Sequence, residues 1–398
     1  MAFFRKRKTQ QSVYLDHAAG TPLDAAVFQA MKPYLTEHVA NPSALYRGAV
    51  QAKQTIEQAR KTIASFLHAT DDSVIFSRGG TQSINMALLG AARSHRSLGN
   101  HIVTTQVEHH AVLHTLAQLE KEGFEVTYLP VDESGAVSAK QVQEALRHDT
   151  ILVSVMYANN EIGTIEPIAE IGKMILQRRK KEKTPYPLFH TDACQAAGSL
   201  DMSVERLHVD LLSFNGSKIY GPKGVGVLYK RRGVEVDPTL FGGGQEFGFS
   251  PGTEDVAGIV GLGTAVSLIS ETKSENTIAA LRDLLWKEIQ TTIEDTVLNG
   301  PAREDERLHN NLNVSFLGAD AEAIILYLDA KGIQVSSGSA CTTDSDELSH
   351  VLTACGYDEA RMMSSIRFSL GKGTTQNDIE HVLKALSEVV QKVRSMNS

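Results

Sequence analysis

The chain has 398 residues, of which 42% are hydrophobic and 22% are charged, a length and composition typical of a globular protein with about two or three domains. Its formal net charge of −8 argues against a nucleic-acid partner, because domains that bind nucleic acid usually carry a basic face. No apolar stretch approaches the roughly 20 residues that a membrane span needs, so we expect no membrane association.

The N-terminal residues 1–12 and the three cysteines bear on the cellular location of the protein. The tail begins with basic residues and continues with polar ones, without the apolar segment of a secretory signal, and we expect it to be flexible. The three cysteines, Cys194, Cys341 and Cys355, form no CxxC pair, which predicts neither structural disulfides nor a metal site. A cytoplasmic location, where thiols stay reduced, is therefore expected.

Strand-like and helix-like segments alternate over residues 73–230, as expected for an α/β fold with a mostly parallel central sheet and helices on both faces. Short apolar or β-branched runs bounded by turn residues predict the strands. These runs are residues 73–76, 101–104, 125–128, 151–155, 188–190, 211–213 and 226–229. Helices are predicted between most of them, for example over residues 84–93 and 111–121.

The pattern changes at about Val256. An apolar-periodic run to about Ile293 is followed by a strand over residues 312–316, a helix near 321–331 and an amphipathic helix over about 376–394. We therefore predict a large domain over residues 21–255, and a smaller α+β domain formed by residues 13–20 and 256–398.

Lys218 stands where a buried strand is predicted to end. It follows an apolar run and a turn-forming stretch of Asn, Gly and Ser, so its amine should emerge at the carboxyl edge of the sheet, where open α/β sheets bind ligands. A partly desolvated lysine can form a Schiff base. The apolar run 188–191 delivers Asp192, and a lysine with an aspartate for the pyridine nitrogen is the combination that pyridoxal 5'-phosphate (PLP) requires. The pair predicts a PLP enzyme.

Polar groups follow the other predicted strands at the same edge. Gly80 and Thr81 open a helix after the strand at 73–76, where backbone N–H groups and a hydroxyl can hold a phosphate. His109 follows the strand at 101–104, Asn160 follows 151–155, and Gln195 follows Asp192. Each residue alone has an ordinary explanation as a turn former or a buried polar group. Their repetition at five strand ends favours a single site.

Cys341 lies in a stretch of small polar residues, 336–345, that has no apolar period. Such a loop should be mobile and exposed. An exposed thiol on a mobile loop can act as a thiolate nucleophile when a cation or a base meets it. Cys194 and Cys355 lie in helix-like or packed contexts and are predicted to be buried structural cysteines.

The order and spacing of these motifs resemble those of the NifS/IscS-like cysteine desulfurases, members of the fold-type I aminotransferase superfamily, over nearly the whole chain. The long loop around Cys341 is similar to that of the first group of this family. The motifs that carry the resemblance are residues 13–19, 41–43, 80–85, 108–113, 159–163, 190–195, 216–224, 242–246, 252–254, 337–341 and 365–370.

The resemblance implies a role for each site residue. Lys218 would carry the PLP, Asp192 would pair with its pyridine nitrogen, and His109 would stack on the ring and move protons. Cys341 would receive the sulfur. Substrate-binding and further cofactor-binding roles are implied for Arg367 and Asn41, and for Gly80, Thr81, Asn160, Gln195, Asn215, Ser217 and, across the interface of a homodimer, Thr253.

The implied activity is the conversion of L-cysteine to L-alanine, with the sulfur captured as a persulfide on Cys341. The sulfur would then pass to a protein acceptor, to supply iron–sulfur clusters or thiolated molecules. Several residues depart from the common family pattern. Asn215 and Ser217 stand where many members have Ser or Ala and His before the lysine, and Ser250 replaces a usual arginine. Gly20 replaces a threonine, and residues 346–348 replace a common Leu-Glu-Pro.

Two alternatives from other classes stay open. One is another fold-type I PLP enzyme, such as an aminotransferase, a selenocysteine lyase or a β-lyase that releases free sulfide. The other is a non-catalytic relative that serves as a partner in a sulfur-handling complex. Cys341 in its loop argues against the first, and the combination of Lys218, Asp192 and His109 argues against the second.

Overall fold

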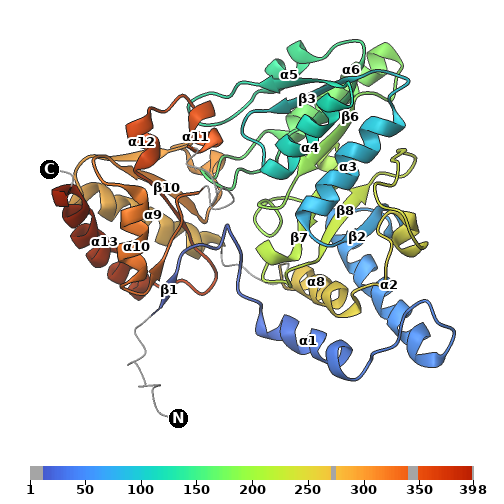
Figure 1. The fold of residues 1–398 in the computed structure, drawn as a ribbon, viewed down its shortest axis with the longest axis horizontal. Helices are drawn as coiled ribbons and strands as arrows, with labels where there is room; N and C mark the ends of the chain where they lie inside the picture. The colour runs from blue at the N-terminus through green and yellow to red at the C-terminus, as the bar shows by residue number, and fades with distance from the viewer. Residues whose placement is uncertain (1–11, 270–274, 339–347, 397–398) are drawn as a thin grey trace.

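The computed structural model describes residues 12–269, 275–338 and 348–396. Its main sheet has seven strands in the order β2-β8-β7-β6-β5-β3-β4 (Figure 1). The neighbours from β7 to β4 pair in parallel, and β8 runs antiparallel to both β2 and β7, which confirms a mostly parallel sheet. The strands are β2 (Val74–Ser77), β3 (His101–Thr105), β4 (Glu125–Leu129), β5 (Thr150–Ser154), β6 (Leu188–Asp192), β7 (Leu211–Asn215) and β8 (Gly226–Lys230).

Side chains of the main sheet alternate between its two faces, because successive residues of a strand point to opposite sides. In β7, Leu211 packs into one apolar core, while Leu212 and Phe214 pack into the other. All three side chains are fully buried. Both faces must therefore be covered by helices, and this explains the continuous apolar runs in the sequence.

Helices cover the main sheet in two layers (Figure 1). The core that contains Leu211 is closed by α3 (Gly80–Ser94) and α4 (His110–Lys121). The helices that contribute to the opposite core are α1 (Ala25–Thr36), α2 (Arg47–Leu67), α5 (Ala139–Ala145), α6 (Ile168–Glu182), α7 (Val204–Leu207) and α8 (Val256–Ile269). None of the described helices combines the length and the hydropathy that a membrane crossing requires.

A second, antiparallel sheet has the order β12-β10-β9 and its own apolar core. Three helices pack with it (Figure 1). These elements are β9 (Thr296–Asn299), β10 (Asn311–Phe316), β12 (Ser365–Ser369), α9 (Glu275–Thr292), α10 (Ala321–Asp329) and α13 (Gln376–Met396). Two short helices, α11 (His350–Ala354) and α12 (Glu359–Met363), precede β12.

The N-terminal segment joins this smaller unit before the chain enters the larger one. Strand β1 (Val13–Tyr14) pairs in parallel with β11 (Ile333–Gln334). The Ser369 N–H donates to the Leu15 carbonyl at 2.8 Å, and the His17 N–H donates to the Ser369 carbonyl at 3.2 Å. The next helix, α1 (Ala25–Thr36), packs on α8 (Figure 1). Residues 13–17 therefore attach to the smaller unit, through β11 and β12.

The strands and helices expected from the sequence are present, with one difference in how they are grouped. The apolar run from Val256 contains two helices, α8 and α9, and the buried side chains of α8 belong to the core of the seven-stranded sheet. The division into two domains stays a prediction. The packing of α8 favours a boundary after Ile269 over one before Val256.

A buried ion pair fixes the loop that follows β8. Arg60 of α2 makes two bonds to the Glu246 carboxylate, at 2.7 and 2.9 Å, and donates to the Val74 carbonyl at 2.7 Å. Glu246 also accepts from the Phe76 N–H at 2.7 Å. The side chains of the pair are 4% and 5% exposed. The pair holds Glu246 and Phe247, both with positive φ (49° and 58°), against β2.

Arg60→Met is expected to lower the free energy of unfolding by roughly 3–5 kcal/mol, because it leaves the Glu246 carboxylate buried without its cation. Urea denaturation followed by circular dichroism measures the loss. Adding Glu246→Gln to this variant removes the orphaned charge and keeps an acceptor for Phe76, so the double variant should recover part of the stability. A single variant within about 0.5 kcal/mol of the wild type, the range of ordinary surface changes, would show that the pair does not hold the loop.

Candidate active site

Four neighbouring parallel strands end in polar residues that the sequence analysis singled out. In sheet order, His109 follows β3 and Asn160 follows β5. Asp192 is the last residue of β6, and Lys218 follows β7. Strands β6 and β7 pair in parallel with Asp192 opposite Ser213. Since parallel strands end at the same edge of a sheet, these four residues gather at its carboxyl edge.

Lys218 ends a short 3-10 turn, η2 (Gly216–Lys218), directly after β7. Its Nζ donates to the carbonyl oxygens of Ala18 and Ala19, both at 2.7 Å. Gln195 Nε2 donates to the same Ala18 carbonyl at 3.0 Å. The N-terminal segment therefore lies directly against the lysine, and Gln195 is fixed beside it.

His109 is a half-buried imidazole at the start of α4. Its Nδ1 accepts the Ala111 N–H at 3.0 Å, so the ring proton is assigned to Nε2. Burial lowers the pKa of His109, while the Asp192 carboxylate raises it and the Lys218 amine lowers it. These effects show that His109, Asp192 and Lys218 lie within electrostatic reach of one another.

Asp192 is 4% exposed, and its Oδ1 accepts from the Cys194 N–H at 2.9 Å. His190, on the same strand, lies between two hydroxyl groups, those of Ser154 at 2.9 Å and Ser213 at 3.1 Å. Burial lowers the pKa of His190 to about 4, so this ring is neutral and gives Asp192 no counter-ion. A buried carboxylate in this position fits the protonated pyridine nitrogen of PLP.

Glu108, the residue before His109, is a second buried carboxyl group. Its Oε1 accepts from the Thr105 hydroxyl at 2.9 Å and from the Met156 N–H at 2.8 Å. Burial raises the pKa of Glu108 well above its usual value. Burial thus favours the neutral form of this carboxyl group and disfavours a second negative charge near Asp192.

The first turn of α3 lies against the ends of β6 and β7. A methyl group on Gly80 would lie 2.7 Å from Cys194 Sγ and 2.9 Å from Asn215 Nδ2, so only glycine permits this approach. The N-cap residue, Gly79, gives no side-chain cap to the first N–H groups. Ser217 donates to Asn215 Oδ1 at 3.1 Å. An uncapped helix N-terminus beside amide and hydroxyl donors fits the phosphate of PLP.

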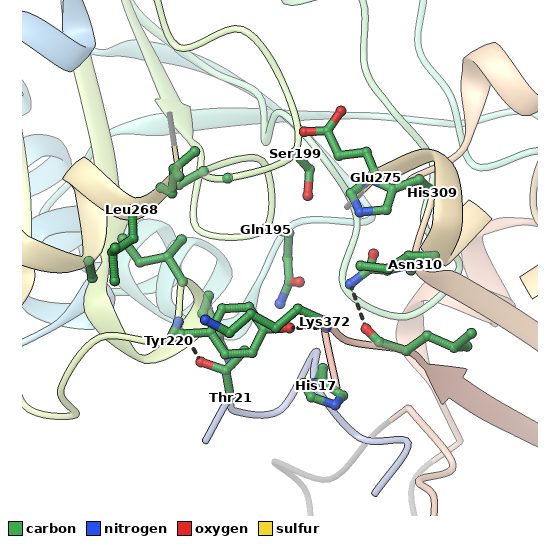
Figure 2. A pocket seen from close by; sticks show the side chains of 18 residues that line it. His17, Thr21, Gln195, Ser199, Tyr220, Leu268, Glu275, His309, Asn310 and Lys372 are labelled. Carbon is green, nitrogen blue, oxygen red and sulfur yellow. Dashed lines mark hydrogen bonds between the residues drawn. The ribbon is translucent and has the colours of Figure 1, made fainter. Parts of the chain in front are cut away.

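Thr81 and His109 line a common hollow of about 340 Å³ between the N-termini of α3 and α4. A second hollow, of about 80 Å³, lies where the larger and smaller units meet (Figure 2). It is lined by Lys218, Gln195 and His309, among others, but not by Asp192. This second hollow has room for a few water molecules and adjoins the predicted cofactor site without coinciding with it.

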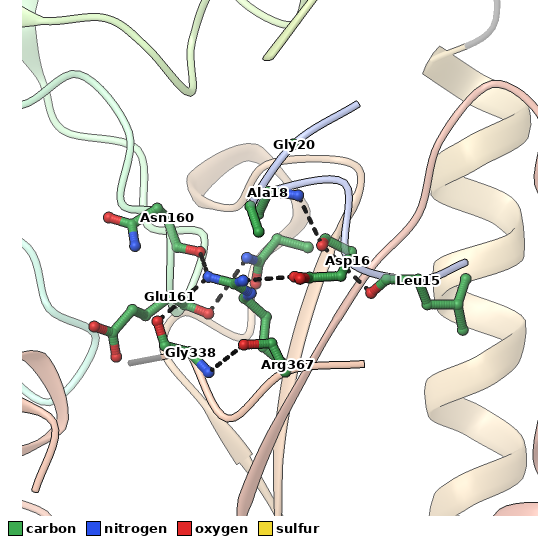
Figure 3. Close-up of polar contacts among 12 residues, drawn as sticks. Leu15, Asp16, Ala18, Gly20, Asn160, Glu161, Gly338 and Arg367 are labelled. Atoms are coloured by element: carbon green, nitrogen blue, oxygen red, sulfur yellow. Dashed lines mark hydrogen bonds and ion pairs between the residues drawn. The ribbon is translucent and has the colours of Figure 1, made fainter. Parts of the chain in front are cut away.

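Arg367 reaches the site from β12 of the smaller sheet. Its NH2 donates to Asp16 Oδ1 at 2.7 Å, and its NH1 donates to the carbonyl oxygens of Asn160 at 3.0 Å and Gly338 at 3.5 Å (Figure 3). The Nε atom is buried and has no partner among the described residues. Arg367 thus joins the N-terminal segment, the loop after β5 and the residues that precede 339–347.

Cys341 lies outside the described residues, but the residues that flank 339–347 are described. Gly338 accepts from Arg367, and the Ser349 hydroxyl donates to Glu161 Oε2 at 2.6 Å. His350 Nε2 donates to the Glu108 carbonyl at 2.9 Å. The flank that follows 339–347 is therefore bound to the loops that carry Asn160 and His109, and the flank that precedes it is bound to Arg367.

Two predicted site residues make no described contact with the rest of the candidate site. Thr253 is exposed on the loop before α8. Asn41 is also exposed, and its side chain accepts from the Ser43 N–H at 2.9 Å. No described contact joins either residue to Lys218 or Arg367, and their roles stay predictions. Within the described ranges, no group of three or more His, Cys, Asp or Glu side chains is arranged to hold a metal ion.

The sequence analysis missed Asp16 and Glu161 as functional candidates. Asp16 pairs with Arg367, and Glu161 holds the flank of the Cys341 segment. Both residues fall within motifs that carry the family resemblance, and this was the available signal. The contacts join residues 351 and 188 positions apart, which no local spacing reveals.

The sequence model of the aminotransferase class-V family matches residues 13–382. The chain belongs to this family. It is 48% identical over 389 residues to a protein of Methanosarcina thermophila named cysteine desulfurase IscS, covering 97% of this chain and 94% of that protein. A protein of the same name from Dictyoglomus turgidum is 46% identical over 390 residues, covering 98% and 97%.

Solved structures resemble this fold over nearly its full length. A structure titled NIFS-like protein is 34% identical, with a TM-score of 0.89, and the match covers 96% of this chain and 100% of that one. A structure titled SspA in complex with cysteine is 36% identical, with a TM-score of 0.78 and coverage of 92% and 100%. The expected fold-type I aminotransferase architecture is confirmed.

Gly80→Ala is expected to weaken PLP binding by roughly tenfold or more and to destabilise the protein by about 1–3 kcal/mol, because the added methyl group displaces Cys194 and Asn215 from the first turn of α3. Equilibrium dialysis with PLP and thermal unfolding measure the two effects. Adding Cys194→Ala should restore part of both. The control is Gly373→Ala, since its methyl group would meet open space. PLP affinity unchanged in Gly80→Ala would remove α3 from the cofactor site.

Proposed function

We propose that this protein is a PLP-dependent cysteine desulfurase, which converts L-cysteine to L-alanine and retains the sulfur as a persulfide. The observation that carries the proposal is the gathering of Lys218, Asp192 and His109 at one sheet edge, with Arg367 beside the loop after β5. Relatives of the same length that are named cysteine desulfurase support it. So does the fold match to a structure titled as a complex with cysteine.

Lys218 would bind PLP covalently, Asp192 would hold a proton at its pyridine nitrogen, and His109 would lie on its ring. The phosphate would be held by the first turn of α3 and by Asn215 and Ser217. Asn160 and Gln195 complete the proposed cofactor set. When bound, PLP withdraws electrons from the substrate's Cα and so makes its proton acidic.

The protein's own residues then bind the substrate and move its protons. Arg367 is proposed to bind the substrate carboxylate as a two-pronged donor, with Asn41 beside it. Lys218, once its amine is free, is proposed to take the proton from Cα. Burial lowers the pKa of His109 and so favours its neutral form. With the ring proton on Nε2, the imidazole can accept a proton from a thiol only at Nδ1, which must first release the Ala111 N–H.

The sulfur step needs a thiolate, and Cys341 is proposed to supply it. Its sulfur bonds to the substrate sulfur as the Cβ–S bond breaks, and Cβ gains a proton. One L-cysteine and one protein thiol thus give one L-alanine and one protein persulfide, without an external oxidant. The other cysteines are unsuited, since burial raises the pKa of Cys355 to about 12 and that of Cys194 well above its usual value.

A homodimer is proposed to complete the site, with Thr253 of one subunit reaching the phosphate of the other. Large apolar side chains are strongly exposed around the connection from α1 to α2, and a gathering of exposed apolar side chains in one segment favours an interface. They are Leu35 (58%), Val39 (79%), Leu45 (95%) and Tyr46 (60%). A protein sulfur acceptor, a role in iron–sulfur cluster assembly and a cytoplasmic location are part of the same proposal.

The proposal is tested by incubating the PLP-loaded protein with L-cysteine and measuring alanine and protein-bound sulfur. The wild type should form both in equal amounts. Lys218→Ala should form no alanine, and borohydride should no longer fix PLP to the protein. Cys341→Ser should retain PLP but fail to capture sulfur. If Cys341→Ser releases alanine and free sulfide at the wild-type rate, the protein is a β-lyase.

The pH dependence of kcat/KM should report the neutral form of His109. Because burial lowers the pKa of His109 from 6.5, the ring stays neutral above that pH and becomes protonated only below it. Activity should therefore hold down to about pH 6.5 and fall roughly tenfold per unit below the lowered pKa. This acid limb should be absent from His109→Gln. A limb centred above pH 6.5, or one unchanged in that variant, would exclude this role.

A further inference from the structure

The guanidinium of Arg367 is already engaged by a carboxylate of the protein itself. Arg367 is 2% exposed, and its NH2 donates to Asp16 Oδ1 at 2.7 Å (Figure 3). The carbonyl oxygens of Asn160 and Gly338 occupy its NH1. The Nε atom is buried and lacks a partner within the described part of the chain. Of the guanidinium edge formed by Nε and NH2, only NH2 thus donates a hydrogen bond to a described residue.

Backbone pairing places Asp16 at this edge. Asp16 bridges Ser369 in a parallel arrangement, while Arg367 lies two residues earlier on the same strand, β12. Residues i and i+2 of a strand share a face, so Asp16 is a diagonal neighbour of Arg367 on that strand. The Asp16 side chain is 19% exposed, whereas that of Arg367 is 3% exposed. The carboxylate therefore has solvent on one side into which it can turn.

We propose that Asp16 competes with the substrate's carboxylate for Arg367 and thereby sets the affinity of the site for amino acids. This inference rests on the proposed function, in which Arg367 binds the carboxylate of L-cysteine.

The buried Nε is the reason to expect competition. A buried donor without a partner is costly, and a carboxylate that binds Nε and NH2 together satisfies it and gives the strongest geometry for an arginine. Asp16 contacts NH2 alone. The incoming carboxylate must share or take over that NH2, and two carboxylates on one guanidinium repel each other. Asp16 therefore has to yield when substrate binds.

Asp16 also has a reason to be present in the empty site. Arg367 would otherwise be a buried cation without a counter-ion, which destabilises a fold strongly. The carboxylate of Asp16 neutralises it until substrate arrives. Replacing Asp16 by Asn keeps an acceptor for NH2 and removes the negative charge, so the charge effect is isolated from the hydrogen bond.

The test uses the PLP-loaded protein and two probes. The first, 3-mercaptopropionate, carries the thiol and carboxylate of L-cysteine without its amine, and the second, cysteamine, carries the thiol and amine without the carboxylate. Inhibition constants of both probes and the KM for L-cysteine are measured for the wild type, Asp16→Asn and Asp16→Glu. Asp24→Asn is the matched control, because Asp24 pairs with Lys372, another cation of the smaller unit.

Asp16→Asn should bind 3-mercaptopropionate roughly three- to tenfold more tightly and lower the KM for L-cysteine by a similar factor, the size expected for one partly screened like-charge contact. Cysteamine binding should not change. Asp16→Glu and Asp24→Asn should keep the wild-type constants within about twofold. The stability that Asp16→Asn loses should return when 3-mercaptopropionate is added.

Unchanged or weaker binding of 3-mercaptopropionate by Asp16→Asn would overturn the inference and make Asp16 a support for Arg367. Equal tightening for cysteamine would also overturn it, since that probe has no carboxylate to compete. A wild type that forms no alanine from L-cysteine would instead overturn the proposed function. The constants for 3-mercaptopropionate would then still decide whether Asp16 competes for Arg367.

Discussion

Two contacts of the segment from Asp16 to Ala19 hold the site together. The carbonyl oxygens of Ala18 and Ala19 bind the amine of Lys218, and the Asp16 carboxylate binds Arg367. Lys218 belongs to the seven-stranded sheet and Arg367 to the smaller one, so four residues connect the two cations that the proposed chemistry requires. Since residues 15–17 also pair with β12, the smaller unit fixes where this segment meets the lysine.

Burial decides which groups of the site carry charge. Burial raises the pKa of Glu108 and lowers the pKa values of His109 and His190, so it favours the neutral form of each of these three groups. Burial thereby disfavours a second carboxylate and an imidazolium beside Asp192. A site with one carboxylate, one lysine and one neutral imidazole suits a cofactor that needs a protonated ring nitrogen and a mobile proton.

The sequence predicts the parts of the site that depend on local pattern. Apolar runs followed by turn residues located the strands, and Lys218 and Asp192 could be placed at one edge because parallel strands end together. Other features depend on contacts across the fold. The apolar sequence of α8 would suit the core of either unit, and only its packing shows that it belongs to the core of the seven-stranded sheet. The role proposed for Asp16 depends on its contact with an arginine 351 residues away. The role proposed for Thr253 depends on a second chain.

Peptide mass spectrometry after a single turnover tests most directly whether the sulfur of L-cysteine ends on Cys341. The PLP-loaded protein is mixed with a limiting amount of L-cysteine without added thiol, alkylated and digested. We expect one extra sulfur atom on the peptide that contains Cys341, because burial raises the thiol pKa of both Cys194 and Cys355 and leaves them weak nucleophiles. Extra sulfur on the Cys194 or Cys355 peptide, or on none of the three, would contradict it.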